Sequence, residues 1–359
     1  MTSIRASARA YENWMRTQLG EDLVEADLEE KHRKMRKGAF PFLRATYWRW
    51  AETILEIRPE IAEAPRVLSI GDTHLENFGT WRDIEGRLIW GANDFDDAAI
   101  MPWPLDILRL AVSALLARGD GAPTADAICA ALRDGYAEGL AHPAPVVLER
   151  DHAWLREAVV LPEAKRAKFW SDLEALEPQR ARRRYRNALR AAMPDPDMVL
   201  TIAPRQAGTG SLGRPRFVAH GTWLGGPAVR EAKALLLSAW SRCHARRGTA
   251  IRAGEIAAGR HRAPDPQYRV LDDILVRRLS PNSRKIEVKD EVDLKLLLSR
   301  EMLALMGREI AACHADDRRR LPGLEEDLRN RDAAWLREAA EAVAEQVAGE
   351  HKEFARHGR

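Results

Sequence analysis

The stretch SIGDTHLENFG, residues 69–79, follows a short apolar run and places Asp72, His74 and Asn77 within six positions. The preceding residues, RVLSI, predict a buried strand, and GRLIWGANDFDD, residues 86–97, predicts a second strand after a turn. The three side chains are therefore expected on a loop between two strands. Binding and catalytic residues are frequent on such loops.

A second acidic group lies at the end of the next predicted strand, where NDFDDA contributes Asp94, Asp96 and Asp97. Mg²⁺ prefers oxygen ligands and takes only one or two of them from the protein when it also binds phosphates. The sequence therefore predicts a Mg²⁺ site formed by Asn77, Asp94 and Asp96. Because this set has no thiolate ligand, it argues against zinc.

The segment GTGSLG, residues 208–213, has the spacing G-x-G-x-x-G within a strand pattern. A dinucleotide-binding fingerprint needs a helix at the third glycine, whereas the following RPRFVAHGTW predicts another strand. The hairpin context favours a glycine loop of the kinase type, whose backbone N–H groups approach phosphate oxygens. The residues expected to contact a nucleotide here are Gly208, Thr209, Gly210, Ser211 and Gly213.

A cation is expected on the strand after this loop, and AVREAK provides both Arg230 and Lys233. Either side chain could bind phosphate, and the sequence leaves the choice open. Glu255, on the next predicted helix, is a candidate to pair with the cation as the helix glutamate of kinases does. Glu231 competes with it for this role.

These segments together resemble the kinase-like superfamily, with its glycine loop, strand cation, catalytic loop and metal aspartate. GDTHLENFG is similar to the G-D-x-H-x-x-N loop of aminoglycoside phosphotransferases and choline kinases, and NDFDDA with PWPLD resembles the metal segment and the following structural aspartate, here Asp106. The resemblance implies that Asp72 orients or deprotonates an acceptor hydroxyl and that His74 positions the loop.

A closer resemblance covers residues 35–315. The segments KGAFPFLRATYWRW, GDTHLENFG, NDFDDA, GTGSLGRPRF and VREAK, in this order, resemble the bacterial family named Domain of Unknown Function 2252. That name carries no reaction, so the functional prediction depends on the kinase-like segments.

In kinases the glycine lobe comes first, whereas here the catalytic loop leads. The resemblance therefore implies an α+β, two-lobed, protein-kinase-like fold that is circularly permuted. Residues 1–195 would form a mostly helical large lobe, residues 196–290 a small antiparallel β lobe, and residues 291–359 helices that return to the large lobe. EMLALMGREIAACH resembles the helix before the catalytic loop, which predicts that its last residue, His314, lies near residues 66–72.

This chain departs from the superfamily pattern at two positions. Ile70 stands where H-G-D or H-R-D loops begin, and Arg230 stands at the strand position of the phosphate-binding lysine. Arginine keeps the charge but replaces a compact ammonium by a planar fork, so Lys233 is a possible substitute.

The whole-chain composition gives little support to a nucleic-acid or membrane partner, because 57 basic and 54 acidic residues leave a net charge of +3. Three scattered cysteines and the lack of a signal-like or membrane-spanning apolar run predict a cytoplasmic protein. The expected partners are a nucleotide and an unidentified hydroxyl-bearing acceptor.

The leading functional prediction is a phosphotransferase that uses ATP and Mg²⁺ to modify a hydroxyl of a small molecule or protein. One alternative is a pseudokinase that binds nucleotide without turnover, because the strand lysine is replaced. A remote alternative is a metallophosphoesterase, which GDTH suggests; however, the sequence has no second Gly-Asp-x-His segment and no Gly-Asn-His-Glu run to supply further ligands.

Overall fold

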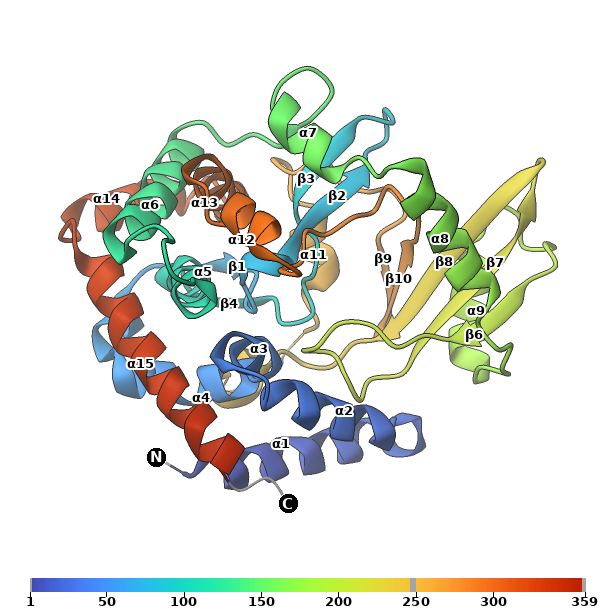
Figure 1. The fold of residues 1–359 in the computed structure, drawn as a ribbon, viewed down its shortest axis with the longest axis horizontal. Coiled ribbons are helices and arrows are strands. Elements are labelled where there is room, and N and C mark those ends of the chain that lie inside the picture. Colours follow the sequence, from blue (N-terminus) through green and yellow to red (C-terminus); the bar gives the residue numbers. More distant parts are fainter. Residues whose placement is uncertain (1, 246–249, 357–359) are drawn as a thin grey trace.

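The computed structural model describes residues 2–245 and 250–356. It is a mixed α+β structure in which about half of the chain is helical and the described strands form small antiparallel sheets (Figure 1). This confirms the predicted α+β class. The two-lobed, circularly permuted kinase-like arrangement stays a prediction.

The largest sheet has five strands in the order β6 (Thr201–Pro204), β7 (Arg216–Trp223), β8 (Gly226–Ala234), β10 (Ile274–Arg278) and β9 (Arg269–Leu271). Its two faces are covered by different helices, since successive side chains of a strand point to opposite sides. Val218 packs beside Leu173 of α8 (Glu163–Glu174), whereas its neighbour Ala219 packs beside Leu189 of α9 (Arg183–Ala191).

Two smaller sheets hold the loops that the sequence singled out. β1 (Arg66–Ser69) pairs with β4 (Ala99–Pro102), and β2 (Phe78–Arg82) pairs with β3 (Leu88–Ala92), which also contacts β5 (Val146–Val147). β1 and β3 confirm the two strands predicted on either side of the motif. Residues 70–77 run from β1 to β2 and residues 93–98 run from β3 to β4, so the same two sheets anchor both loops.

A close backbone contact joins these two loops. Gly71 has a φ of +92°, and a Cβ at this position would lie 2.3 Å from the carbonyl oxygen of Asp97. Glycine is required for both reasons, since other residues rarely adopt this φ and any side chain would meet backbone. The contact places the predicted catalytic loop directly against the predicted metal segment.

The remaining helices form a body around a large apolar core, with α13 against α6 and α15 along α5 (Figure 1). Their bounds are α1 (Ile4–Leu19), α2 (Glu25–Met35), α3 (Ala39–Ala45), α4 (Tyr47–Ile57), α5 (Pro104–Ala117), α6 (Ala125–Ala141), α7 (Ala153–Val159), α10 (Ala239–His244), α11 (Ala253–Ala257), α12 (Glu291–Leu297), α13 (Arg300–His314), α14 (Leu321–Asn330) and α15 (Trp335–Arg356). Within the described residues, no helix combines the length and apolarity needed to cross a membrane.

One buried carboxylate ties the catalytic loop to this helical body. Asp106, near the start of α5, accepts hydrogen bonds from the backbone N–H groups of Ile70 (2.6 Å) and Gly71 (2.9 Å). Its Oδ2 also lies 3.1 Å from Nε2 of His314, and Nδ1 of that ring lies 2.9 Å from the hydroxyl of Tyr136. The predicted proximity of His314 to residues 66–72 is therefore confirmed.

Replacing this carboxylate should destabilise the fold strongly. Asp106→Ala leaves two buried N–H groups without their acceptors, and each such loss costs about 1–3 kcal/mol. We expect urea denaturation to show a loss of about 3 kcal/mol or more in the free energy of unfolding. The control Asp120→Ala changes an exposed loop residue and should stay within about 0.5 kcal/mol of the parent. A loss below about 1 kcal/mol in Asp106→Ala would contradict the role given to this side chain.

Candidate functional site

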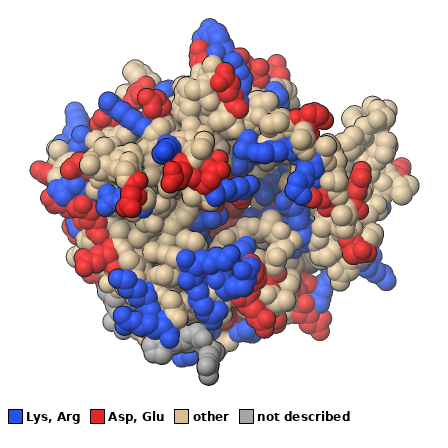
Figure 2. Space-filling model, in the orientation of Figure 1, with Lys and Arg blue, Asp and Glu red and all other residues tan. Residues whose placement is uncertain are grey.

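A single cavity of about 380 Å³ collects most of the residues that the sequence predicted. Its wall is formed by the loop before β2, the segment after β3, the glycine loop between β6 and β7, and the segment that follows β10. The predicted residues that line it are Asp72, His74, Asn77, Asp94, Asp96, Gly208, Thr209, Gly210 and Ser211. Lys and Arg side chains gather around a hollow on this face of the molecule (Figure 2).

Asp72 presents one carboxylate oxygen to this cavity while the other is held by a buried arginine. Nε and Nη2 of Arg109 donate to Oδ1 at 2.9 and 2.6 Å. Oδ2 lies on the side of the glycine loop, 3.4 Å from where a Cβ on Gly210 would stand. Burial raises the pKa of Asp72, although the charge and hydrogen bonds of Arg109 oppose the shift. The geometry suits a group that accepts a proton or orients a hydroxyl.

The guanidinium of Arg109 is itself fixed from three sides. It is fully buried, donates from Nη2 to the carbonyl oxygen of Leu43 at 2.8 Å, and lies 4.9 Å from the ring centre of Tyr47 and 5.0 Å from that of Trp50. Such contacts leave little freedom to the carboxylate that it holds.

The side chain of His74 contacts the backbone of its own loop. Its Nδ1 accepts a hydrogen bond from the backbone N–H of Glu76 at 3.1 Å, which caps the short turn Leu75–Asn77. Burial, with Arg44 and Lys285 nearby, holds the pKa of His74 well below its usual value, so the ring is neutral. These contacts agree with a positioning role rather than proton transfer.

Asn77 and Asp94 provide oxygen atoms suited to a hard cation. The Nδ2 group of Asn77 donates to the carbonyl oxygens of Asp72 (3.0 Å) and Asp94 (3.1 Å), which turns Oδ1 away from both. That Oδ1 is buried and has no hydrogen-bond partner among the described residues. A buried, unpaired amide oxygen and a carboxylate that line the same cavity are oxygen donors of the kind that Mg²⁺ prefers, so these residues fit the predicted ion.

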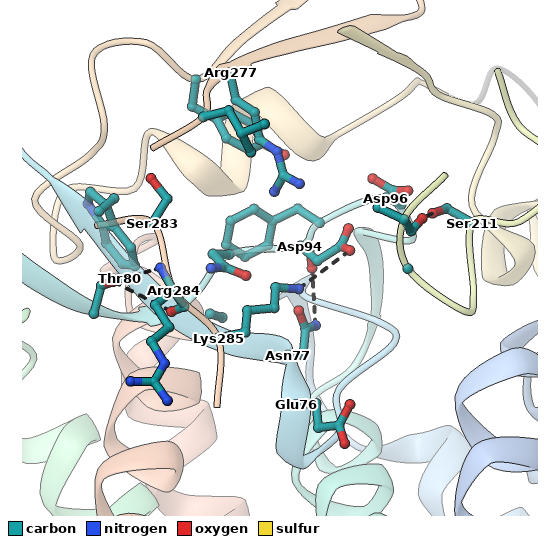
Figure 3. A pocket seen from close by; sticks show the side chains of 18 of the residues that line it. Glu76, Asn77, Thr80, Asp94, Asp96, Ser211, Arg277, Ser283, Arg284 and Lys285 are labelled. Atoms are coloured by element: carbon teal, nitrogen blue, oxygen red, sulfur yellow. Dashed lines mark hydrogen bonds and ion pairs between the residues drawn. The ribbon is translucent and has the colours of Figure 1, made fainter. Parts of the chain in front are cut away.

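Lys233 holds the acidic segment from the side of the five-stranded sheet. Its Nζ lies 2.6 Å from Asp96 and 3.4 Å from Oδ1 of Asp94, and Lys285 approaches the other oxygen of Asp94 at 3.8 Å. Figure 3 shows Lys285 reaching toward Asp94 and Asn77. Burial alone would raise the pKa of Asp94, but the two lysines hold this pKa well below its usual value.

Asp96 is engaged more fully than its neighbour Asp94. Lys233 contacts its Oδ1 and Arg214 donates to its Oδ2 at 3.1 Å. Both oxygens thus have cationic partners, which makes Asp96 a weaker metal-ligand candidate than Asp94.

The glycine loop is fastened by cationic side chains from two directions. Lys31 of α2 donates to the carbonyl oxygen of Gly210 at 3.1 Å, and Arg216 donates to Oγ of Ser211 at 2.9 Å. Burial and the nearby Arg214 lower the pKa of Lys31 to about 8. Gly213 is not among the cavity-lining residues, since it packs under Leu28 with a φ of +96° and serves the turn.

Arg230, Lys233 and Glu255 are not among the residues that line the cavity, although Lys233 lies buried behind it against Asp94 and Asp96. Arg230 points to the α9 side of β8, where Nε donates to the carbonyl oxygen of Ala192 at 2.9 Å. Residues three apart on a strand lie on opposite faces, so Lys233 and Arg230 cannot share the cavity side. Glu255 is half exposed, and its carboxylate pairs with Arg252 at 2.5 Å.

Sequence reasoning missed several cationic residues of the site. Arg109 lies within PWPLDILRLAVSALLA, and a lone arginine in a helix that is buried almost all round is a signal that could have found it. Arg214 directly follows the last glycine of the loop. Lys285 lies in a segment after β10 that returns to the cavity, and no local sequence pattern predicts this return.

Comparison with known proteins places part of the chain in a family. Residues 23–197, which contain the catalytic-type loop and the acidic segment, match the model of the family described as "Uncharacterized protein conserved in bacteria (DUF2252)". The match supports the resemblance seen in the sequence up to residue 197, and the segments GTGSLGRPRF and VREAK lie outside it. The searches of curated proteins and of solved structures found no match.

Proposed function

We propose that this protein is a phosphotransferase that uses ATP and Mg²⁺ to phosphorylate a hydroxyl group. The observation that carries the proposal is the convergence, in one cavity, of Asp72, of Asn77 with Asp94, and of the glycine loop. The glycine loop begins more than 110 residues after Asp94 in the chain. The stability of the fold alone does not require these segments to meet around an open space lined with cations.

In this proposal Asp72 accepts the hydrogen bond, and then the proton, of the acceptor hydroxyl. Arg109 fixes Oδ1, so Oδ2 is the oxygen available for this contact. The glycine loop binds phosphate oxygens through backbone N–H groups, and the buried Lys233 adds positive charge behind the acidic segment. Catalysis would come mainly from positioning and from electrostatic stabilisation.

Asn77 and Asp94 would hold the Mg²⁺ ion. When bound, the ion supplies positive charge to the phosphate oxygens of the nucleotide. The residues of this chain keep the two ligands in place, because Asn77 is anchored through Nδ2 and Asp94 is faced by Lys233 and Lys285.

The alternatives receive less support. The pseudokinase reading began from Arg230 at the strand-lysine position, but Lys233 supplies an ammonium beside the acidic segment. A two-metal phosphoesterase needs more ligands than Asn77 and Asp94, and both oxygens of Asp96 face cations.

Binding and turnover can be tested together. At an ATP concentration 100 times its Kd, Mg-ATP should stabilise the folded protein by about 2.7 kcal/mol, measured as a rise in melting temperature. ADP release, with water or a panel of hydroxyl compounds as acceptor, then tests turnover. Adenosine with Mg²⁺ is the control, since it lacks the phosphates that the cations would bind.

The outcomes separate the hypotheses. Stabilisation with ADP release supports the phosphotransferase, whereas stabilisation without ADP release for any acceptor supports the pseudokinase. An unchanged melting temperature at millimolar Mg-ATP contradicts both.

A further inference from the structure

Glu231 lies at the centre of an unusual group of charges on the cavity side of the five-stranded sheet. Arg216 approaches its Oε1 at 2.6 Å, Arg277 approaches the same oxygen at 2.8 Å, and Arg205 pairs with Oε2. We call Glu231 with Arg205, Arg216 and Arg277 the Glu231 cluster. None of the proposed catalytic steps uses it.

The strand register explains how the cluster forms. Glu231 on β8 lies directly opposite Arg277 on β10 and opposite Val218 on β7, so Arg216, two residues before Val218, shares its face. Arg205 follows the end of β6, and its N–H bonds to the carbonyl oxygen of Arg216. Adjacent strands therefore direct one carboxylate and three guanidinium groups to the same side.

The cluster keeps a positive charge in a poorly hydrated place. The exposed fraction is 1% for the Glu231 side chain and 5% for that of Arg216. Although burial alone would raise it, the three guanidinium groups hold the pKa of Glu231 well below its usual value, so the carboxylate is ionised. Within these four side chains, three positive charges against one negative charge leave +2, and the two arginines beyond the buried Glu231–Arg216 pair, Arg205 and Arg277, face the cavity, where an anion could compensate them.

The cluster also keeps hydrogen-bond donors for a ligand. A guanidinium carries five N–H donors, and Glu231 engages only two nitrogen atoms of Arg277 and one of Arg205. These two side chains are 21% and 30% exposed and, like Arg216, line the cavity. Figure 3 shows Arg277 reaching into the cavity toward Asp94.

We propose that the Glu231 cluster is a phosphate-binding site, separate from the glycine loop and the Mg²⁺ ligands. A terminal phosphate carries about −1.5 to −2 charges near neutral pH, which matches the +2 of the cluster. Its oxygens suit the planar forks of Arg205 and Arg277. Glu231 is a positioning residue, since it holds together guanidinium groups that would otherwise repel one another.

The place of this site in catalysis rests on the proposed phosphotransferase function. The phosphate could belong to the nucleotide, or to an acceptor that carries a phosphate besides its hydroxyl. Arg216 donates a hydrogen bond to Ser211 of the glycine loop, so the cluster lies next to the loop.

Pyrophosphate is a suitable probe, because its binding can be measured without Mg²⁺, nucleotide or turnover. Isothermal titration of the full chain at low ionic strength should show binding that weakens with added salt. Arg277→Gln and Arg205→Gln should each raise the Kd about tenfold or more, since each removes charge-assisted hydrogen bonds. The control Arg269→Gln alters an exposed arginine on β9 of the same sheet and should leave the Kd unchanged.

Circular dichroism and melting temperature establish that each variant is folded. If Arg277→Gln does not fold, Arg205→Gln, which changes the more exposed position, is used to test the proposal. Wild-type protein that does not bind pyrophosphate, or folded variants that bind it as tightly as wild type, would overturn the proposal.

A competition arm identifies the source of the phosphate. Displacement of pyrophosphate by Mg-free ATP supports a nucleotide phosphate, and binding of pyrophosphate beside saturating ATP supports an acceptor phosphate. These titrations need no reaction, so they test the phosphate-binding site independently of turnover. Pyrophosphate binding without ADP release supports the site alone, and ADP release without pyrophosphate binding supports the reaction alone.

Discussion

Asp72→Ala is expected to lower the rate of ADP formation by about 10²–10⁴-fold, the usual contribution of a positioned general base. Oδ2 of Asp72 is the carboxylate oxygen that Arg109 leaves for an acceptor hydroxyl. Mg-ATP binding, measured by the rise in melting temperature, should change little, because this carboxylate is not assigned to the nucleotide. A folded variant with normal turnover would rule out the role given to Asp72.

Asp72→Asn provides a sharper version of the same experiment. The amide oxygen can still accept from Arg109, so the loop keeps its main contact while the charge and basicity are lost. A comparable loss of rate in both variants points to chemistry and not to collapse of the loop. Asp120→Asn, in an exposed loop, is the matched control and should keep full activity.

The pH dependence gives an independent readout of the same group. Burial raises the pKa of Asp72 above the ordinary aspartate value, and the base must be ionised to act. On the proposed function, the kcat/KM of the wild-type protein should therefore fall as the pH drops through this raised pKa, at a higher pH than an exposed aspartate would produce. Asp72→Asn should lose that acidic limb.

Asp94→Asn is expected to abolish Mg²⁺-dependent turnover. Asp94 provides the carboxylate of the proposed ligand pair and anchors Asn77 through its backbone carbonyl oxygen, and an amide in its place removes the negative charge that would hold the ion. ADP release should be titrated with MgCl₂ at fixed ATP, and the variant should show no saturable rise in rate.

The charge balance of the site makes a second readout possible. Without this carboxylate, Lys233 and Lys285 lose one of their counter-charges, so Mg-free ATP should bind to Asp94→Asn at least as tightly as to wild type. Loss of turnover with ATP binding retained separates a metal-ligand role from misfolding. Normal Mg²⁺ dependence in the folded variant would refute the assignment.

Local patterns predicted those parts of the site that depend on short segments. The apolar run before Asp72 and the segment after a turn that leads to Asp94 indicated two strands, which the structure contains as β1 and β3. The glycine spacing in a strand context indicated a loop that the structure places on the cavity wall. Local backbone preferences determine such features, so a window of about ten residues carries the information.

The choice between Arg230 and Lys233 needed the facing strands as well. Strand alternation separates the two residues, but only pairing with β7 and β10 reveals which face turns toward the acidic segment. Glu255 was proposed by analogy of chain order. In the structure its helix presents it to solvent, beside Arg252.

The contacts of Arg109 and of the Glu231 cluster could not be predicted from the sequence for a different reason. They join side chains that are 37 and up to 46 residues apart, and their energies depend on burial that only the packed fold creates. The sequence shows these residues as ordinary charges on a helix and on strands.

The hydrogen bonds of Asp106 anchor the Asp72 wall of the cavity to the helical body, whereas the glycine turn is anchored in another way. Through this carboxylate, the backbone at Ile70 and Gly71 is part of the same cooperative unit as α5 and α13, so the base next to it is preorganised before any substrate arrives. The glycine-rich turn next to Asp72 is held instead by single contacts from Lys31, Arg216, Arg214 and the backbone of Val24. Admission of substrate and escape of product should therefore proceed by displacement of the glycine turn, while the wall that carries Asp72 stays still.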